Sequence, residues 1–288
     1  MAFFGSSAWL EHRRHRAQDH DLTGSRSCRG ILAAQRGIRS IDPLQHAGYR
    51  RWNMCDHLCL DFVRSSLTGV DVAGKSVIEV GSYDVNGSAR SILQPMGPSR
   101  YVGVDIAPGP GVDIVCNAEN LIEKFGQSSF DVVVSTEMLE HVYEWRLVVS
   151  TLKRLLKPGG SLLITTRRIG FDFHGYPHDY WRFERDDFQR IFSDLEIRRL
   201  ECDDTNHGIF LLAQRPEAFT ESDLSSHELY SILSGKRERE LENWEIKFFT
   251  ASRRVGEVIY PYLGRYGNLL PPVLRKSVKK VFARHLRA

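Results

Sequence analysis

A glycine and several polar residues follow a short apolar run near the end of the first third of the chain. Val77-Ile78-Glu79-Val80 has β-type composition, and Gly81, Ser82 and, after a loop, Gly87 come next. In open α/β sheets, ligands bind at the carboxyl ends of strands, where a glycine lets them approach the backbone closely. We therefore expect Glu79, Gly81, Ser82 and Gly87 to border a ligand. A tight turn without a ligand is the alternative, since the segment is not GxGxxG.

Two further strand ends carry groups that suit a nucleoside. Asp105 ends the next β-type run, where an acid can accept hydrogen bonds from both ribose hydroxyls, and Ile106 can cover one face of an adenine. Asn117 and Ala118 follow the third run, so Asn117 can meet the adenine amino group while a backbone amide meets a ring nitrogen. Any one of these residues can be an ordinary polar group at a strand end. Three successive strand ends together indicate a nucleoside site.

The fourth β-type run leads into residues that can move a proton. Ser135 and Thr136 end the run, and we expect them to border the same ligand. If the next segment is helical, Glu137, Glu140 and His141 share one face. His141 can then act as a general base that deprotonates a hydroxyl near neutral pH, with Glu137 beside it. The alternative is that these side chains only shape the pocket by hydrogen bonding.

The segment from Gly170 to Phe183 is dense in aromatic residues and histidines. A loop of this composition after a strand is typical of a lid over a second substrate, which His178 or Tyr180 would contact at a hydroxyl. His178 is therefore a second candidate catalytic residue for moving the hydroxyl proton. Because buried rings usually serve packing, the alternative is that Tyr180, Trp181 and Phe183 anchor the loop on the core.

These residues need a scaffold in which short strands alternate with helices, the pattern of a parallel sheet with crossover helices. The predicted strands are Ser76–Val80, Tyr101–Asp105, Val112–Val115, Phe130–Ser135, Ser161–Thr165, Leu195–Cys202 and Gly208–Gln214. The predicted helices are a segment within His46–Leu67, then Ser88–Leu93, Ala118–Phe125, Tyr143–Leu156 and Arg185–Phe192. The last two strands are joined by a turn without a helix, so they form a closing antiparallel pair. The fold class is α/β, a Rossmann-like three-layer sandwich with a seven-stranded, mostly parallel sheet and helical extensions at both termini.

Several of these pieces together resemble the class I S-adenosylmethionine-dependent methyltransferases of the small-molecule type (type 11-like). The resemblance covers roughly residues 75–214. The matching pieces are Glu79-Val80-Gly81, Asp105, Asn117-Ala118-Glu119, Phe130-Asp131-Val132-Val133-Val134-Ser135 and Leu155-Leu156-Lys157-Pro158-Gly159-Gly160. Tyr83 and Val85 stand where that family often has glycines, and Asn117 replaces its usual aspartate, so we expect altered affinity for the cofactor.

The resemblance implies an enzyme that uses S-adenosylmethionine to methylate a small-molecule or glycan acceptor, most simply at a hydroxyl. It also raises a metal-binding variant, in which Glu137, Glu140 and His141 hold a divalent ion as a similar motif does in some quinone-type O-methyltransferases. A non-catalytic nucleoside-binding or partner-docking module is a different class of function for the same fold. A nicotinamide oxidoreductase is disfavoured by the missing GxGxxG and by the closing strand pair.

Charge is distributed unevenly along the 288 residues, although the net charge is only +3. Residues 1–50 carry eight arginines against four acids, and residues 236–288 carry thirteen basic residues against five acids, so the middle of the chain is acidic. We expect a poorly ordered basic leader over 1–45, the methyltransferase domain with its preceding helix over 46–216, and a helical basic extension over 217–288. The basic helix over 273–286 can touch anionic lipid head groups as a peripheral membrane contact, nucleic acid or an acidic partner. A solvated helix that packs its apolar face on the core is the favoured alternative, and the helix does not indicate a nucleic-acid enzyme.

No apolar run is long enough for a transmembrane helix, and no signal peptide precedes the charged residues near Glu11. The five cysteines are odd in number and lack a CxxC pair, which favours reduced thiols and a cytoplasmic location over a disulfide framework. Oligomeric state is left open by the sequence.

Overall fold

The computed structural model describes residues 57–174, 178–247, 249 and 251. The helices in this part of the chain are α1 (His57–Ser66), α2 (Gly69–Val72), α3 (Arg90–Leu93), α4 (Leu121–Phe125), α5 (Trp145–Leu155) and α6 (Arg185–Ile191), with short 3-10 helices η3 (Gln94–Met96), η4 (Ala118–Asn120) and η5 (Leu139–His141). The strands are β1 (Ser76–Val80), β2 (Arg100–Asp105), β3 (Ile114–Val115), β4 (Phe130–Thr136), β5 (Leu156–Arg167), β6 (Trp181–Arg182), β7 (Glu196–Asp203), β8 (Gly208–Gln214), β9 (Leu229–Ser231) and β10 (Lys236–Glu238).

Seven strands form the central sheet in the order β3-β2-β1-β4-β5-β8-β7. β1 pairs in parallel with β2 and β4, β4 with β5, and β2 with β3. β8 runs antiparallel to both β5 and β7, so it is the reversed strand of this sheet. This confirms the Rossmann-like α/β fold class and the closing antiparallel pair. From β1, the strands β2 and β3 are added on one side of the sheet and the strands β4 and β5 on the other. Ligands of open α/β sheets bind at such a switch point, here between β1 and β4.

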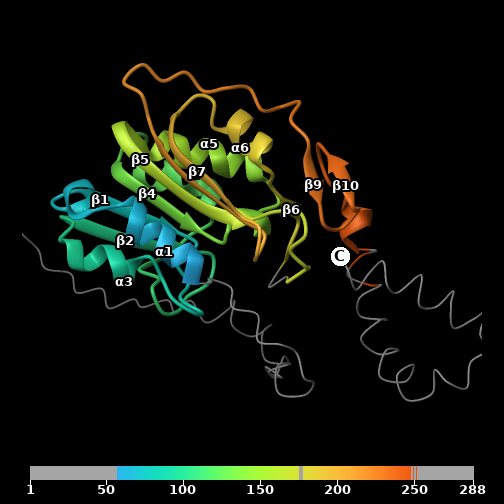
Figure 1. The fold of residues 1–288 in the computed structure, drawn as a ribbon, viewed down its shortest axis with the longest axis horizontal. Helices are drawn as coiled ribbons and strands as arrows, with labels where there is room; N and C mark the ends of the chain where they lie inside the picture. Colours follow the sequence, from blue (N-terminus) through green and yellow to red (C-terminus); the bar gives the residue numbers. More distant parts are fainter. Residues whose placement is uncertain (1–56, 175–177, 248, 250, 252–288) are drawn as a thin grey trace, which may run out of the picture. The chain divides into compact units, whose positions relative to one another are not determined.

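Both faces of the central strands are buried, which explains their nearly continuous apolar sequences. In β1, Val77 packs on one face with Phe62 of α1 and Leu93 of α3. The next residue, Ile78, packs on the other face with residues of α5 and α6 such as Trp145. Figure 1 shows α1 and α3 on one side of the sheet and α5 and α6 on the other. The sheet is therefore the middle layer of three.

Most predicted elements are confirmed within a few residues, and β1 and β8 have the predicted bounds. The helix predicted from Ser88 begins instead at Arg90, because the Ser88 hydroxyl and the Ala89 amide both donate to the Glu79 carboxylate. The third predicted strand is reduced to two residues, Ile114 and Val115. Of the helix predicted within 46–67, the described part is α1.

The helical prediction for the segment after Pro216 is wrong over 229–238. β9 and β10 form a hairpin, and β9 also pairs with β6, giving a separate three-stranded antiparallel sheet. Leu229 and Ser231 are buried while Tyr230 between them is less so, the alternation of a strand, and Gly235 supplies the positive φ of the turn at +73°. Arg237 of β10 holds this sheet against α6 by pairing with both carboxylate oxygens of Asp187, at 2.8 to 3.0 Å.

The predicted leader over 1–45 and the basic helix over 273–286 lie outside the described residues, as do Cys28 and Cys55. Cys116 and Cys202 are free thiols, and the buried Sγ of Cys59 lies 2.9 Å from the Thr165 hydroxyl. None of the described helices has the length and apolar character needed to cross a membrane.

Candidate functional site

The loop after β1 is shaped by Gly81. Its φ of +82° is a left-handed conformation that glycine adopts without strain, and a Cβ placed there would lie 2.7 Å from Cγ of Met138. The amides of Gly81 and Ser82 both donate to the Val104 carbonyl of β2, at 2.9 and 3.1 Å. The backbone of this loop is therefore tied to the neighbouring strand, and the missing side chain at Gly81 makes room for Met138.

Gly81→Ala is expected to lower the free energy of unfolding by more than Gly74→Ala does. Both glycines have a similar positive φ, +82° and +69°, so each alanine meets backbone strain of about 1–3 kcal/mol. Only at position 81 does the added methyl also collide with Met138, whereas nothing lies within 4 Å at position 74. Urea unfolding of both variants measures the difference. Equal losses would mean that the close approach to Met138 is unimportant.

Asp105 stands at the carboxyl end of β2 with its carboxylate held in place. One oxygen accepts from the Tyr83 amide and the other from the Ala107 amide, each at 3.1 Å. Since each carboxylate oxygen can accept a second hydrogen bond, both remain able to take a hydroxyl donor. Ile106, the next residue, is 60% exposed although it is apolar. The edge of β2 thus offers a fixed two-oxygen acceptor beside an uncovered apolar side chain, as a ribose and an adenine require.

Glu79 is buried, and its carboxylate is engaged within the protein. It accepts from the Ser88 hydroxyl, the Ala89 amide and the Tyr101 hydroxyl, the last at 2.7 Å. Burial raises the pKa of Glu79, and these hydrogen bonds only partly offset that effect. The side chain joins β1 to the start of α3 and to β2. We therefore infer that Glu79 positions the first loop, while its contact with a ligand at the β1 end stays a prediction.

Asn117 precedes η4 and caps it, because its side-chain oxygen accepts from the Glu119 amide at 3.2 Å. That oxygen retains a lone pair for an external donor. Ala118 beside it is 8% exposed and packs into the core. Asn117 and Ala118 thus follow β3, as the sequence predicts. Their contact with an adenine stays a prediction.

The remaining predicted ligand contacts differ in their surroundings. The buried hydroxyls of Ser82 and Ser135 have no hydrogen-bond partner among the described residues. The Ser82 hydroxyl lies close to Gly103 under the β2–β3 connection, whereas Ser135 and Thr136 end β4. Gly87, with φ +129°, packs against Leu60 of α1. An unsatisfied buried hydroxyl at the end of β4 is the kind of group that a bound ligand would complete.

Glu137 does not share a face with Glu140 and His141, so the single-face prediction is wrong. The segment is not an α-helix: Glu137 has a positive φ of +52°, and only Leu139–His141 form a 3-10 turn. The Glu137 carboxylate instead pairs with the buried Arg167 guanidinium at the end of β5. The predicted metal set of Glu137, Glu140 and His141 therefore does not fit this geometry.

Glu140 and His141 are joined by a histidine from the loop after β5, His174. Oε1 of Glu140 lies 3.9 Å from Nε2 of His141 and 3.7 Å from Nε2 of His174. Oε2 of Glu140 accepts from the Thr166 hydroxyl at 2.7 Å. We call Glu140, His141 and His174 the polar cluster. Glu140 and His141 belong to η5, directly after Met138, which lies against Gly81. The polar cluster therefore borders the same sheet edge as Gly81.

The pKa values of Glu140 and His174 are each shifted by the charges of neighbouring side chains. Burial lowers the pKa of His174, but the Asp179 and Glu140 carboxylates outweigh it and raise that pKa to about 9. Burial raises the pKa of Glu140, yet His174, His141 and Thr166 hold it at about 2. Asp179 is in turn bound by Arg182, whose side chain is fully buried, at 2.5 and 2.8 Å. The loop that carries His174 is thus fixed by buried ionic groups.

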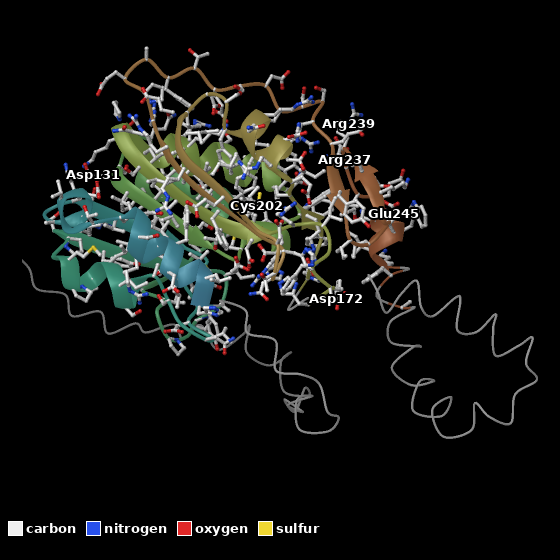
Figure 2. All side chains as sticks on the ribbon, in the orientation of Figure 1. Asp131, Asp172, Cys202, Arg237, Arg239 and Glu245 are labelled. Atoms are coloured by element: carbon white, nitrogen blue, oxygen red, sulfur yellow. The ribbon has the colours of Figure 1, made fainter. Side chains whose placement is uncertain are left out.

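His178, which the sequence offered as a second proton-moving residue, enters the site through its backbone. Its carbonyl contacts Nδ1 of His141, while its exposed ring stacks on Tyr180 at 5.5 Å. Tyr180, Trp181 and Phe183 are buried, in agreement with the packing alternative for this segment. Figure 2 shows Asp172 of the same loop at the opposite end of the sheet from Asp131, which binds the first residue of β1. The loop therefore lies at the carboxyl edge of the sheet.

Sequence reasoning missed His174, Asp179 and Arg182 as members of the site. The signal was present in the loop composition, since all three residues lie in the same 170–183 segment as His178 and Tyr180. Spacing could not reveal the contact, because His174 is far from Glu140 in sequence and the two meet only across β5.

A seven-stranded sheet in this order, with a nucleoside-type edge formed by β1, β2 and β3, is the fold of the class I S-adenosylmethionine-dependent methyltransferases. The chain belongs to the methyltransferase-domain family, whose sequence model matches residues 49–201, just over half of the chain. The methyl donor of the class is S-adenosylmethionine. The residues present fit it: the Asp105 oxygens retain lone pairs, Ile106 leaves an apolar side chain exposed, and the buried Ser135 hydroxyl lacks a partner among the described residues.

Curated relatives are methyltransferases of two kinds. A probable phthiotriol/phenolphthiotriol dimycocerosates methyltransferase 2 of Mycobacterium ulcerans is 31% identical over 117 residues, 36% of this chain and 44% of that protein. A ubiquinone biosynthesis O-methyltransferase of Idiomarina loihiensis is 30% identical over 120 residues, 37% of this chain and 47% of that protein. The chain spans about half the length of these relatives.

Among solved structures, a Burkholderia thailandensis 1,6-didemethyltoxoflavin-N1-methyltransferase with bound S-adenosylhomocysteine aligns with a TM-score of 0.44 at 15% identity. The alignment covers 56% of this chain and 80% of that one.

Proposed function

We propose that this chain transfers the methyl group of S-adenosylmethionine to a hydroxyl of a small-molecule or glycan acceptor. The observation that carries the proposal is the composition of one sheet edge. Gly81, Asp105 and Asn117 follow β1, β2 and β3, and His141 follows β4. Because these strands run parallel, their carboxyl ends meet at the same edge. This edge would therefore place a nucleoside-type site beside a ring that can accept a proton.

On the donor side, the protein would bind S-adenosylmethionine and align its methyl group with the acceptor. The donor, when bound, supplies a methyl group on a positively charged sulfur, so the leaving group needs no activation. Asp105 would accept from the ribose hydroxyls, and Ile106 and Asn117 would contact the adenine. Ala118 and the Gly81–Ser82 backbone would line the pocket, with Ser135 and Thr136 beside the reacting end. Alignment of two reactants in a site that excludes water accounts for much of the rate of such a displacement.

On the acceptor side, the polar cluster is where the hydroxyl proton would leave. Nδ1 of His141 contacts the His178 carbonyl, which can only accept a hydrogen bond, so in the neutral ring the proton is on Nδ1 and the lone pair is on Nε2. Nε2 is buried 3.9 Å from Oε1 of Glu140 and has no hydrogen-bond partner among the described residues. The likeness to a ubiquinone biosynthesis O-methyltransferase further supports a hydroxyl acceptor.

The proposal is tested with isotopically labelled S-adenosylmethionine and fractionated cell extracts. Transfer of label to a small molecule or glycan, with the product identified as a methyl ether, is the expected result. Label found exclusively on nitrogen or carbon would overturn the hydroxyl assignment, and tight donor binding without transfer to any fraction would favour a non-catalytic module.

Asp105→Ala is expected to weaken S-adenosylmethionine binding about 10- to 100-fold, because two hydrogen bonds to a charged acceptor are lost. Titration calorimetry on the full chain measures it. Asp61→Ala is the matched control, since Asp61 is an exposed acid on α1 that pairs only with Arg64 in the described structure. Unchanged affinity in Asp105→Ala would remove the ribose assignment.

A further inference from the structure

Three ligand-type atoms converge in the polar cluster. Oε1 of Glu140 lies 3.7 Å and 3.9 Å from Nε2 of His174 and of His141, and one ligand atom from each residue lies within 4.8 Å of the others. These distances exceed those of hydrogen bonds. A tetrahedral Zn²⁺ with bonds of about 2.0–2.1 Å separates its ligand atoms by about 3.3 Å, so a small contraction would place all three around one ion.

The converging atoms are buried and unsatisfied. Oε1 of Glu140 and Nε2 of His141 have no hydrogen-bond partner among the described residues, although the Glu140 side chain is fully buried. An unsatisfied buried carboxylate oxygen is costly unless something completes it. Oε1 of Glu140 lies within 4 Å of Nε2 of His141 and of His174, so one ion among these three atoms would complete both unsatisfied atoms at once.

Each of the three residues is also held from its opposite side, as metal ligands are. Oε2 of Glu140 accepts from Thr166 at 2.7 Å. Nδ1 of His174 lies 3.0 Å from Oδ2 of Asp179, and Nδ1 of His141 contacts the His178 carbonyl. A carboxylate or carbonyl on Nδ1 fixes each ring with Nε2 as the coordinating nitrogen. These contacts leave Oε1 of Glu140 and Nε2 of His141 without a hydrogen-bond partner among the described residues, and they place Nε2 of His174 on the side of its ring that faces Oε1 of Glu140.

We propose that Glu140, His141 and His174 form a binding site for one transition-metal dication of the Zn²⁺ type. Two imidazoles and one carboxylate suit Zn²⁺ and its first-row neighbours, while Mg²⁺ takes oxygen ligands and would be excluded. The ligand set replaces Glu137, which is occupied by Arg167, with His174 from the loop after β5. The ion would join that loop to the end of β4.

This inference rests on the proposed function only in its consequence for catalysis. The ion would occupy the lone pair of His141 Nε2, so a metal-loaded cluster and a free His141 base are mutually exclusive. Metal binding itself is measured without turnover.

The test uses the full chain, stripped with a chelator and titrated with Zn²⁺ by calorimetry and with Co²⁺ by visible absorption. We expect one ion per chain, a Co²⁺ spectrum of low coordination number, a rise in Tm with Zn²⁺, and no response to Mg²⁺. His174→Ala and the shape-preserving Glu140→Gln should each weaken Zn²⁺ binding by about 100-fold or more. His57→Ala, at an exposed histidine of α1, should match the unaltered chain and reports on surface binding.

Absence of saturable Zn²⁺ binding, or equal affinity in His174→Ala and the unaltered chain, would overturn the metal site. Calorimetry with S-adenosylmethionine and the labelled-donor assay on the same samples keep the two proposals apart. Transfer that persists at full rate after chelation rejects a catalytic ion and leaves the methyltransferase proposal intact. Zn²⁺ binding without transfer to any acceptor rejects the proposed function and leaves the metal site intact.

Discussion

His141→Asn is expected to lower the rate of methyl transfer about 100- to 10,000-fold, the range usually lost with a positioned proton acceptor. The affinity for S-adenosylmethionine should stay unchanged, because none of the proposed donor contacts, at the ends of β1, β2, β3 and β4, comes from His141. His141 is held by the His178 carbonyl on one side and presents an unpartnered Nε2 on the other. The loss is expected whether Nε2 takes the proton itself or holds an ion. Single-turnover rates with labelled donor measure it.

The matched control is His178→Ala. Its ring is exposed and stacks on Tyr180, while the contact to His141 comes from its backbone carbonyl, which alanine retains. We expect this variant to raise the KM for the acceptor and to leave kcat within a few-fold. A drop in kcat as large as that of His141→Asn would mean that the His178 ring, as the sequence suggested, takes part in proton transfer.

The donor edge could be predicted from the sequence because it depends on local pattern. Short apolar strands buried on both faces are recognisable in the sequence, and each polar residue of interest stands directly after one of them. Gly81, Asp105 and Asn117 therefore fell at strand ends as expected. The parallel pairing of β1 with β2 and β4 then brings them to one edge without further information.

The acceptor edge could not be predicted in the same way, because long-range contacts decide it. The spacing of Glu137, Glu140 and His141 would place them on one face only in an α-helix. The ion pair of Glu137 with Arg167 and the positive φ of Glu137 turn the chain out of that conformation. His174 then takes the place beside Glu140. The hairpin over 229–238 was missed for a related reason: its charged residues suit a helix, and Arg237 becomes a strand residue through its pairing with Asp187.

Arg182→Met is expected to lower the free energy of unfolding by about 3–5 kcal/mol, the cost of leaving a buried charge without its partner. The Arg182 and Asp179 side chains are both fully buried and meet through two hydrogen bonds. Arg182 also donates to the carbonyls of Phe171 and Asp172 at 3.1 Å, so the loop that carries His174 loses three attachments at once. Urea unfolding measures the change, and methionine keeps most of the side-chain volume.

Two comparisons separate the buried charge from the loss of packing. Arg237→Met removes a similar two-oxygen pairing, with Asp187, but the Arg237 side chain is 41% exposed, so about 1 kcal/mol is expected. Arg182→Met combined with Asp179→Asn removes the orphaned charge and should recover part of the stability lost in Arg182→Met alone. A double variant that is less stable than Arg182→Met would show that Asp179 is held by His174 and the His174 amide without Arg182, and that Arg182 acts through the two loop carbonyls.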